Sequence, residues 1–137
     1  MATLDDIDLT ITDDLLREIH EAWEARTLRL KHPYVFDLIK VLATSAKSPR
    51  MSVIDRLYAN RKNAGLPIPE KFDSVVQAQC NYYCRDSDVF KKRGASPSDA
   101  LFSWPNGKGA GVWALIRENA GPWVKANREA LPHRILT

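Results

Sequence analysis

The sequence predicts a mainly α-helical domain with one β-hairpin, in the order helix, helix, helix, hairpin. Three segments with helical periodicity, at about 34–46, 52–64 and 70–84, precede two apolar runs that flank a glycine-rich turn. Two strands alone bury too little apolar surface to be stable in water, so the hairpin needs the helices as support. This order is that of a winged helix, in which the third helix lies in a nucleic-acid groove and the hairpin contacts the backbone beside it.

The hairpin spans residues 100–116. Its strands, 100–104 and 110–116, flank the segment 105–109, whose Asn-Gly step favours the positive φ values of a tight hairpin turn. Pro105 has no backbone N–H and should end the first strand. On the second strand, Trp113 and Leu115 alternate with smaller residues, so one face can pack while the other faces solvent or a ligand.

A helix precedes this unit. Thr12 is expected to cap it, and the acids Asp13 and Asp14 suit the positive end of the helix dipole. We expect the helix to continue to about Leu30, because the residue before Pro33 avoids the helical conformation.

The first helix of the unit, 34–46, is the most hydrophobic, and its apolar residues should form the centre of the core. Asp37, Lys40 and Thr44 are expected on its solvent side. Residues 46–50 read as a turn, after which Ser52 can cap the second helix.

The second helix, 52–64, should bury one apolar stripe and expose a charged one. The buried set is Val53, Ile54, Leu57 and Tyr58, and the exposed set is Asp55, Arg56, Asn60, Arg61 and Lys62. Gly65 is expected to end this helix, with Pro67 and Pro69 beyond it.

The third helix opens at Pro69 or Glu70 and has two distinct faces. Its apolar face contains Phe72, Val75, Val76, Cys80 and Tyr83, and its polar face contains Ser74, Gln77, Asn81 and Arg85. Amides can bond adenine bidentately, arginine can bond guanine, and serine can serve bases or phosphates. The alternative is an ordinary solvated helix face. Gln79 points to the apolar side and needs a buried partner.

The remaining segments are predicted as a basic loop and a short tail. A basic triplet, Lys91-Lys-Arg93, lies between the third helix and the hairpin, where phosphate contacts are expected, and 94–99 reads as a loop. Residues 118–121 read as a break. Pro122 then opens a short helix that reaches Leu131, and Pro132 closes it.

Length and charge limit the kinds of domain and partner that the sequence allows. The 137 residues fit one globular domain, with 1–33 as an acidic extension, 34–117 as the winged helix and 118–137 as a helical tail. Residues 1–24 contain eight acids and one base, whereas residues 25–137 contain nine acids and nineteen bases. A basic body favours a polyanionic partner.

No apolar run approaches the ~20 residues of a membrane span and the acidic start differs from a signal peptide, so a cytoplasmic protein is expected.

Catalytic and metal motifs are not found. Cys80 and Cys84 are expected to be ordinary small residues of one helix, and His20, His32 and His133 are scattered without zinc-ligand spacing. Asp86, Asp88 and Asp99 are explained by turn and cap roles better than by a divalent ion. We therefore expect no enzyme, no cofactor and no metal site.

Three stretches carry a resemblance to a known type of domain. They are Phe72-Asp-Ser-Val-Val with Asn81 to Phe90, then Asp99-Ala-Leu-Phe102, then Gly107 to Leu115. They resemble the HARE-type winged-helix modules that are attached to HNH and other restriction endonucleases, often ones that act on modified DNA. The matching residues are Asp86-Ser87, Phe102 and Gly111-Val-Trp113-Ala-Leu115, and the likeness covers about 34–117. No nuclease domain follows, so the resemblance implies a stand-alone DNA reader or regulator.

The sequence as a whole predicts a non-enzymatic protein that binds double-stranded DNA. Ser74, Gln77, Asn81 and Arg85 would approach base edges. The predicted contacts to the DNA backbone are Arg56, Arg61, Lys62, Lys91, Lys92, Arg93 and Lys108. The alternative is a protein-interaction module, in which the acidic helix at 12–30, which carries Trp23, docks a partner or a second copy of the chain.

Overall fold

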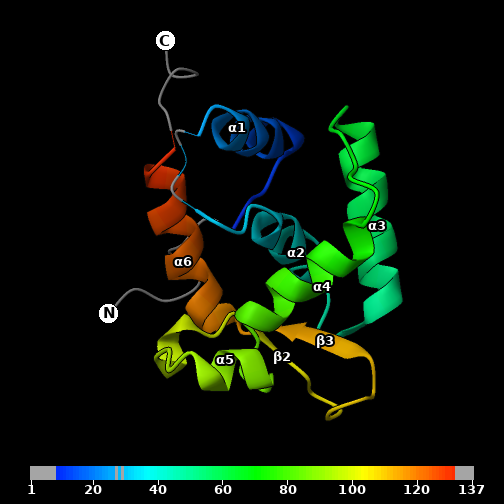
Figure 1. Cartoon of the computed structure of the whole chain (residues 1–137), viewed down its shortest axis with the longest axis vertical. Helices are drawn as coiled ribbons and strands as arrows, with labels where there is room; N and C mark the ends of the chain where they lie inside the picture. The colour runs from blue at the N-terminus through cyan, green and yellow to red at the C-terminus, as the bar shows by residue number, and fades with distance from the viewer. Residues whose placement is uncertain (1–8, 27, 29, 132–137) are drawn as a thin grey trace.

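The computed structural model describes residues 9–26, 28 and 30–131 (Figure 1). Its α-helices are α1 (Asp13–Glu24), α2 (Tyr34–Leu42), α3 (Arg50–Asn63), α4 (Phe72–Tyr82), α5 (Asp88–Lys92) and α6 (Arg117–Glu129). The 3₁₀ helix η2 covers Pro97–Asp99, and the strands are β1 (Ser48–Pro49), β2 (Phe102–Ser103) and β3 (Val112–Leu115). The strands form a small antiparallel sheet in the order β1-β3-β2. The prediction of a mainly helical fold with a small β element is confirmed.

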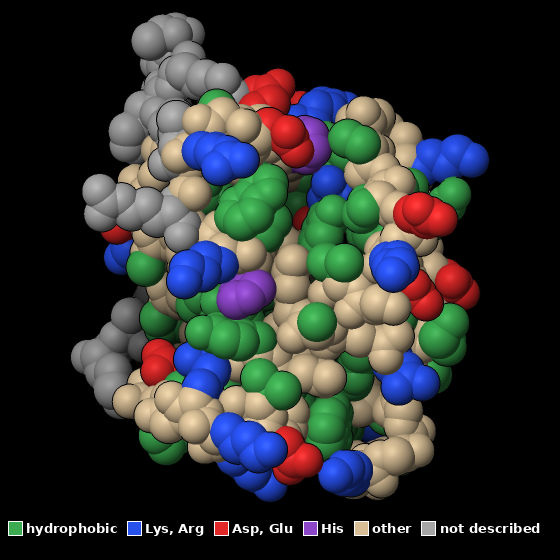
Figure 2. Space-filling view, in the orientation of Figure 1, with side chains coloured by type: hydrophobic (Ala, Val, Ile, Leu, Met, Phe, Trp, Pro, Cys, Tyr) green, Lys and Arg blue, Asp and Glu red, His purple; other side chains and the backbone are tan. Residues whose placement is uncertain are grey.

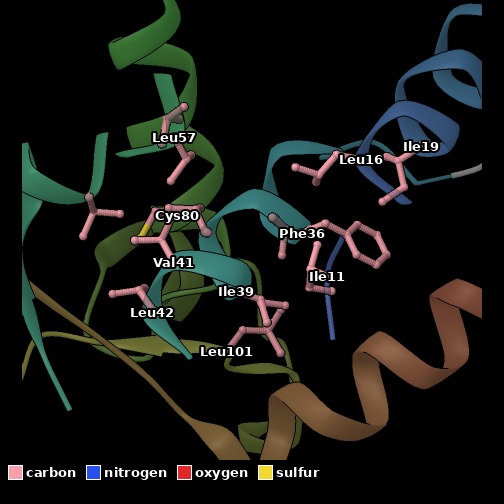
Figure 3. Close-up of a cluster of buried hydrophobic side chains, with 14 of the residues drawn as sticks. Ile11, Leu16, Ile19, Phe36, Ile39, Val41, Leu42, Leu57, Cys80 and Leu101 are labelled. Carbon is pink, nitrogen blue, oxygen red and sulfur yellow. The ribbon is translucent and has the colours of Figure 1, made fainter. Parts of the chain in front are cut away.

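Helix α2 lies at the centre of the core. Figure 1 shows it surrounded by the other long helices, with the sheet at one end of the molecule. Figure 3 shows apolar side chains of α1, α2, α3 and α4 converging around it, among them Leu16, Phe36, Leu57 and Cys80. Val124 of α6 belongs to the same buried cluster. The core thus combines residues from all three segments into which the sequence was divided.

Helix α1 begins as predicted and ends early. The Thr12 hydroxyl accepts a hydrogen bond from the Leu15 N–H at 3.1 Å, as the capping prediction requires. The helix ends at Glu24 instead of near Leu30, because Arg26 adopts a positive φ of 58°. This turn lets Leu28 return to the core, where it is buried. Burial of Leu28 therefore outweighs continuation of the helix.

Two charged residues that were expected on the surface are buried instead. Asp37 of α2 and Arg61 of α3 are 2% and 4% exposed, and an Arg61 Nη1 donates to an Asp37 carboxylate oxygen at 3.0 Å. The prediction was wrong because α2 is covered on nearly every side, so its sequence periodicity does not mark a solvent face. Tyr58 shows the opposite error, since it was expected in the core and is 47% exposed.

The buried pair makes stability depend on pH. Burial raises the pKa of Asp37 from its ordinary 3.8 to about 6, against the opposing attraction of Arg61. Folding therefore takes up a proton between about pH 4 and 6, and the contribution of Asp37 to stability decreases as the pH rises through that window. We expect the free energy of unfolding of the native chain, minus that of an Asp37→Asn variant, to fall over this range by up to about 1.4 kcal/mol per pH unit. Urea unfolding at pH 4.5, 5.5 and 6.5 measures it, and a difference that stays constant or grows contradicts the prediction.

The C-terminal end of α3 was predicted correctly, and its start was not. Gly65, at φ 73°, ends the helix as expected: its N–H donates to the Lys62 carbonyl at 3.1 Å, and the Leu66 N–H donates to the Arg61 carbonyl at 2.9 Å. The start lies at Arg50, so Ser52 is inside the helix and does not cap it. The expected turn at 46–50 contains β1, which pairs with β3 and leads directly into α3.

The hairpin exists, with shorter strands and a wider loop than predicted. Phe102 pairs with Leu115 and Ser103 with Ala114, and the strand ends before Pro105 as expected. Two successive turns replace the tight one: the Gly107 N–H donates to the Trp104 carbonyl, and the Ala110 N–H donates to the Gly107 carbonyl. We call the segment between the two strands the β2–β3 loop (residues 104–111). Its ends are held because β3 pairs with both β1 and β2.

The C-terminal segment corrects the prediction of a break at 118–121. Helix α6 runs through these residues and contains Pro122 in its interior. Ala120 and Gly121 beside it are buried, so packing outweighs the hydrogen bond that proline cannot donate. The basic triplet likewise lies at the end of a helix, α5, and not in a loop. Pro132, His133 and the acids Asp5, Asp6 and Asp8 lie outside the described residues.

No helix in the described part of the chain combines the length and the apolar character needed to cross a membrane.

Candidate nucleic-acid interface

Helix α4 presents a polar face that begins with an exposed acid, Asp73, in its first turn. Ser74 is exposed, and Gln77 and Asn81 are half-buried. Arg85 is not on this helix, which ends at Tyr82 with Tyr83 as its cap. Buried Cys84 forms an isolated bridge with Phe102, and this draws the chain out of the helical path. The Arg85 guanidinium is exposed, with its Nε 4.0 Å from an Asp86 carboxylate oxygen.

The opposite face of α4 is anchored to α2. Gln79 is buried, and its Oε1 accepts the Tyr34 N–H at 2.9 Å. This bond supplies the buried partner that the sequence analysis required for Gln79. Tyr34 follows Pro33 and is the first residue of α2, so its N–H has no hydrogen-bond partner within the helix. The bond with Gln79 satisfies this N–H. The rotation of α4 about its axis, and so the direction of Gln77 and Asn81, is fixed from the core side.

A cleft of about 250 Å³ separates this polar face from the β2–β3 loop. Its lining includes Gln77 and Asn81 of α4, Trp104 and Trp113, and Arg50 at the start of α3. Gly107, Gly109 and Gly111 contribute backbone, and all three have positive φ. The amides predicted to read bases therefore face a loop of the same chain across a small, partly aromatic space.

The β2–β3 loop is held at several points. The Trp104 N–H donates to an Asp86 carboxylate oxygen at 2.7 Å, and Lys47 Nζ donates to Asn106 Oδ1 at 3.0 Å. At the tip, Lys108 Nζ lies 3.6 Å from an Asp88 carboxylate oxygen. Two of the acids thus have partners in this loop: Asp86 holds its backbone, and Asp88 pairs with Lys108. The third acid, Asp99, accepts the Ser96 N–H through a carboxylate oxygen.

Ser87 joins the end of α4 to the start of α5. Its buried hydroxyl donates to the Asn81 carbonyl at 2.5 Å and accepts the Phe90 N–H at 3.1 Å, which caps α5. Lys91 and Lys92, in the last turn of α5, are exposed. The predicted phosphate contacts at these two lysines are thus accessible to a ligand and close in the chain to the amide face.

Arg93 has a different environment from the two lysines. Its guanidinium lies 4.0 Å from the centre of the Tyr82 ring, and its Nε donates to the Tyr82 carbonyl at 2.9 Å. His32 stacks on the same ring at 4.4 Å, and burial, followed by the charge of Arg93, lowers the pKa of His32. Arg93 therefore packs against an aromatic cluster at the end of α4, and its Nη2 is buried with no hydrogen-bond partner among the described residues.

The α3 residues predicted to contact DNA do not lie together. Arg61 is withdrawn into its pair with Asp37, so it is removed from the predicted backbone contacts. Arg56 is exposed and lines a groove with Lys40 and Asn60, on the side of α3 away from the cleft. Lys62 is exposed in the last turn of the helix.

The positions of Arg50 and Lys47 beside the cleft were missed. They come together because β1 pairs with β3 and the Arg50 N–H donates to the Gly111 carbonyl at 2.6 Å. The signal in the sequence was Ser48-Pro49, a short extended segment that was interpreted as a turn.

Figure 2 shows the result on the face that carries α4. The surface over the helix is mostly uncharged, and both basic and acidic side chains lie around it. From the described residues, the basic groups next to the cleft or on α5 are Lys47, Arg50, Arg85, Lys91, Lys92 and Lys108.

In the described ranges, no three His, Cys, Asp or Glu side chains are grouped so as to hold a metal ion. Cys80 and Cys84 are free and buried, and burial raises the pKa of both thiols. A raised pKa keeps a thiol protonated and unreactive.

No protein-family model, no curated protein and no solved structure matches this chain.

Proposed function

We propose that this chain is a non-enzymatic protein of the cytoplasm that binds double-stranded DNA as a winged helix. The observation that carries the proposal is the order of its elements, α2-β1-α3-α4-β2-β3, with the short helices α5 and η2 between α4 and β2, and the sheet order β1-β3-β2. A three-helix unit followed by a hairpin, with the first strand at the far side of the hairpin, is what a winged helix requires. The free thiols of Cys80 and Cys84 suit a reducing compartment.

The surface of α4 supports this assignment. A B-DNA major groove admits one α-helix, and its base edges present donors and acceptors that amides and hydroxyls can bond. Ser74, Gln77 and Asn81 offer these groups without a charge of their own. Arg85 contributes from the segment after α4, where it can reach a guanine or a phosphate.

The basic rim supports contact with phosphates. Lys91 and Lys92 lie on the α5 side of α4, and Lys47, Arg50 and Lys108 lie on the side of the β2–β3 loop. Two cationic sides that flank the amides of α4 match the arrangement in which phosphate contacts position a protein and base contacts specify its site. The resemblance of residues 34–117 to HARE-type modules implies the same partner, and a restriction-associated reader or a regulator stays a prediction.

The experiment is a binding titration with duplex DNA from low to physiological salt. Each phosphate contact contributes about 0.9 to the slope of log K against log salt. We expect a Lys91→Ala/Lys92→Ala variant to bind all sequences more weakly and to lose about two units of slope, whereas Lys125→Ala on α6 should keep the native slope. An unchanged slope in the double variant would remove these lysines from the interface, and no binding at low salt would refute the proposed function.

One observation favours a second candidate function. Trp23 on α1 is 38% exposed beside exposed Glu24, on a helix rich in acids. An exposed tryptophan on an acidic helix suits docking of a partner protein or a second copy. A chain that is dimeric and does not bind DNA at low salt would support this alternative.

A further inference from the structure

The reading amides are half-buried, which is unusual for groups that are to meet the edge of a paired base. Ser74 is open to solvent, but Gln77 and Asn81, one and two turns further along α4, line the cleft with Trp104 on its other side. A duplex that approaches α4 meets Ser74 and the β2–β3 loop. A base that stays paired within the stack can offer Gln77 and Asn81 only its groove edge, whereas an unpaired base can enter the cleft of about 250 Å³ between these amides and Trp104.

The size and lining of the cleft suit a single flat polar group. Its volume of about 250 Å³ exceeds the space that one water molecule needs. Two amides offer donors and acceptors side by side, and a half-buried tryptophan offers an aromatic surface. Enzymes and proteins that take a base out of the stack read it in the same way, by hydrogen bonds to its pairing edge and by stacking on aromatic side chains.

We propose that the cleft between α4 and the β2–β3 loop holds one unpaired nucleobase, stacked on Trp104 and hydrogen-bonded by Gln77 and Asn81. The inference rests on the proposed function, because the base belongs to the DNA that the protein binds. Arg50 at the edge of the cleft supplies a charge for the phosphate of the displaced nucleotide.

The cleft is formed before any ligand binds. Asp86 fixes the backbone of Trp104, and the Lys47–Asn106 and Lys108–Asp88 contacts hold the loop from two sides. The wall contributed by the glycines is backbone, and a Cβ at Gly107, Gly109 or Gly111 would meet no atom within 4 Å. These glycines are therefore required for their positive φ, and they leave space that side chains would otherwise occupy.

The test compares two duplexes of one sequence by fluorescence anisotropy at a fixed salt concentration. In the first duplex a central 2-aminopurine is paired with thymine, and in the second it faces an abasic site. Unpairing and unstacking cost least for a base that has already lost its partner. We expect the second duplex to bind at least tenfold more tightly, and its 2-aminopurine emission to be quenched on binding because the base stacks on Trp104.

Variants at Trp104 assign the effect to the cleft. Base stacking is worth about 5- to 150-fold in affinity by alanine substitution, so Trp104→Ala should weaken binding of the abasic duplex by that factor and remove the preference. Trp104→Phe keeps a ring and should retain most of the preference. Tyr58→Ala, at an exposed aromatic residue on α3, should leave both affinities unchanged. Circular dichroism of each variant identifies a loss of fold.

The outcomes separate the two proposals. Equal binding of the two duplexes by the native chain overturns the inference and leaves the proposed function standing. A preference that survives in a folded Trp104→Ala variant also overturns it, since the base is then held elsewhere. Failure to bind either duplex at low salt refutes the proposed function and the inference together.

Discussion

Replacement of Asp37 by alanine is expected to lower the free energy of unfolding by about 3–5 kcal/mol at pH 7. The substitution leaves the Arg61 guanidinium 4% exposed with no carboxylate beside it. Arg61 Nε already lacks a hydrogen bond among the described residues, so the remaining side chain cannot easily find another partner there. Urea unfolding followed by circular dichroism measures the loss.

Two further variants identify the cause. Asp55→Ala removes an exposed acid from α3 and should change stability by less than about 0.5 kcal/mol. The double substitution Asp37→Leu/Arg61→Met removes both charges and should recover most of the loss, because a well-packed apolar pair can match a buried ion pair. A double variant as unstable as Asp37→Ala would show that lost packing, and not an unpaired charge, is responsible.

Replacement of Phe36 by alanine should destabilise the whole chain by about 3–5 kcal/mol. Phe36 is fully buried in α2, and its ring lies 4.9 Å from the ring of Trp123 in α6. Figure 3 shows it beside Leu16 and Ile19 of α1. The resulting cavity would remove contacts of both flanking helices at once, so thermal unfolding should show one transition at a lower midpoint.

Tyr58→Ala is the matched control, because it removes an aromatic side chain of similar size that is 47% exposed. It should cost less than about 1 kcal/mol. Two separate transitions in the Phe36→Ala variant would contradict a shared core and would favour an independent unit at 34–117.

Local signals in the sequence predicted the ends of several elements. Thr12 as a cap, Gly65 as a stop and Pro105 as a strand end each act through their own backbone or the next few residues. Such effects are visible in a single sequence because they do not depend on what the element packs against.

The errors have a common origin in distant packing. Asp37 is buried because α2 is covered by several elements. Pro122 stays within α6 because the residues beside it are buried against the core. Ser48-Pro49 becomes a strand only because β3 lies beside it. None of these partners is close in sequence, so periodicity and propensity alone favoured the wrong structure.

The candidate site was predicted only in part, because some of its residues depend on packing between distant segments. Gln77 and Asn81 share a face of one helix, and helical spacing is a local property. Arg50 reaches the cleft only through pairing of β3 with β1, across about sixty residues of chain. Arg85 was assigned to the helix because the spacing continued, whereas the bridge between Cys84 and Phe102 ends it.

The hydroxyl of Ser87 links the two sets of residues that the proposed function assigns to DNA. Because it binds the Asn81 carbonyl and caps α5 at the same time, one side chain sets the distance between the amide face and the lysines of α5. Under the proposed function, this distance would set the number of nucleotides between a base bound at the amides and the phosphates bound by the lysines. A change at Ser87 would then alter the preferred spacing between these contacts before it altered the preferred base.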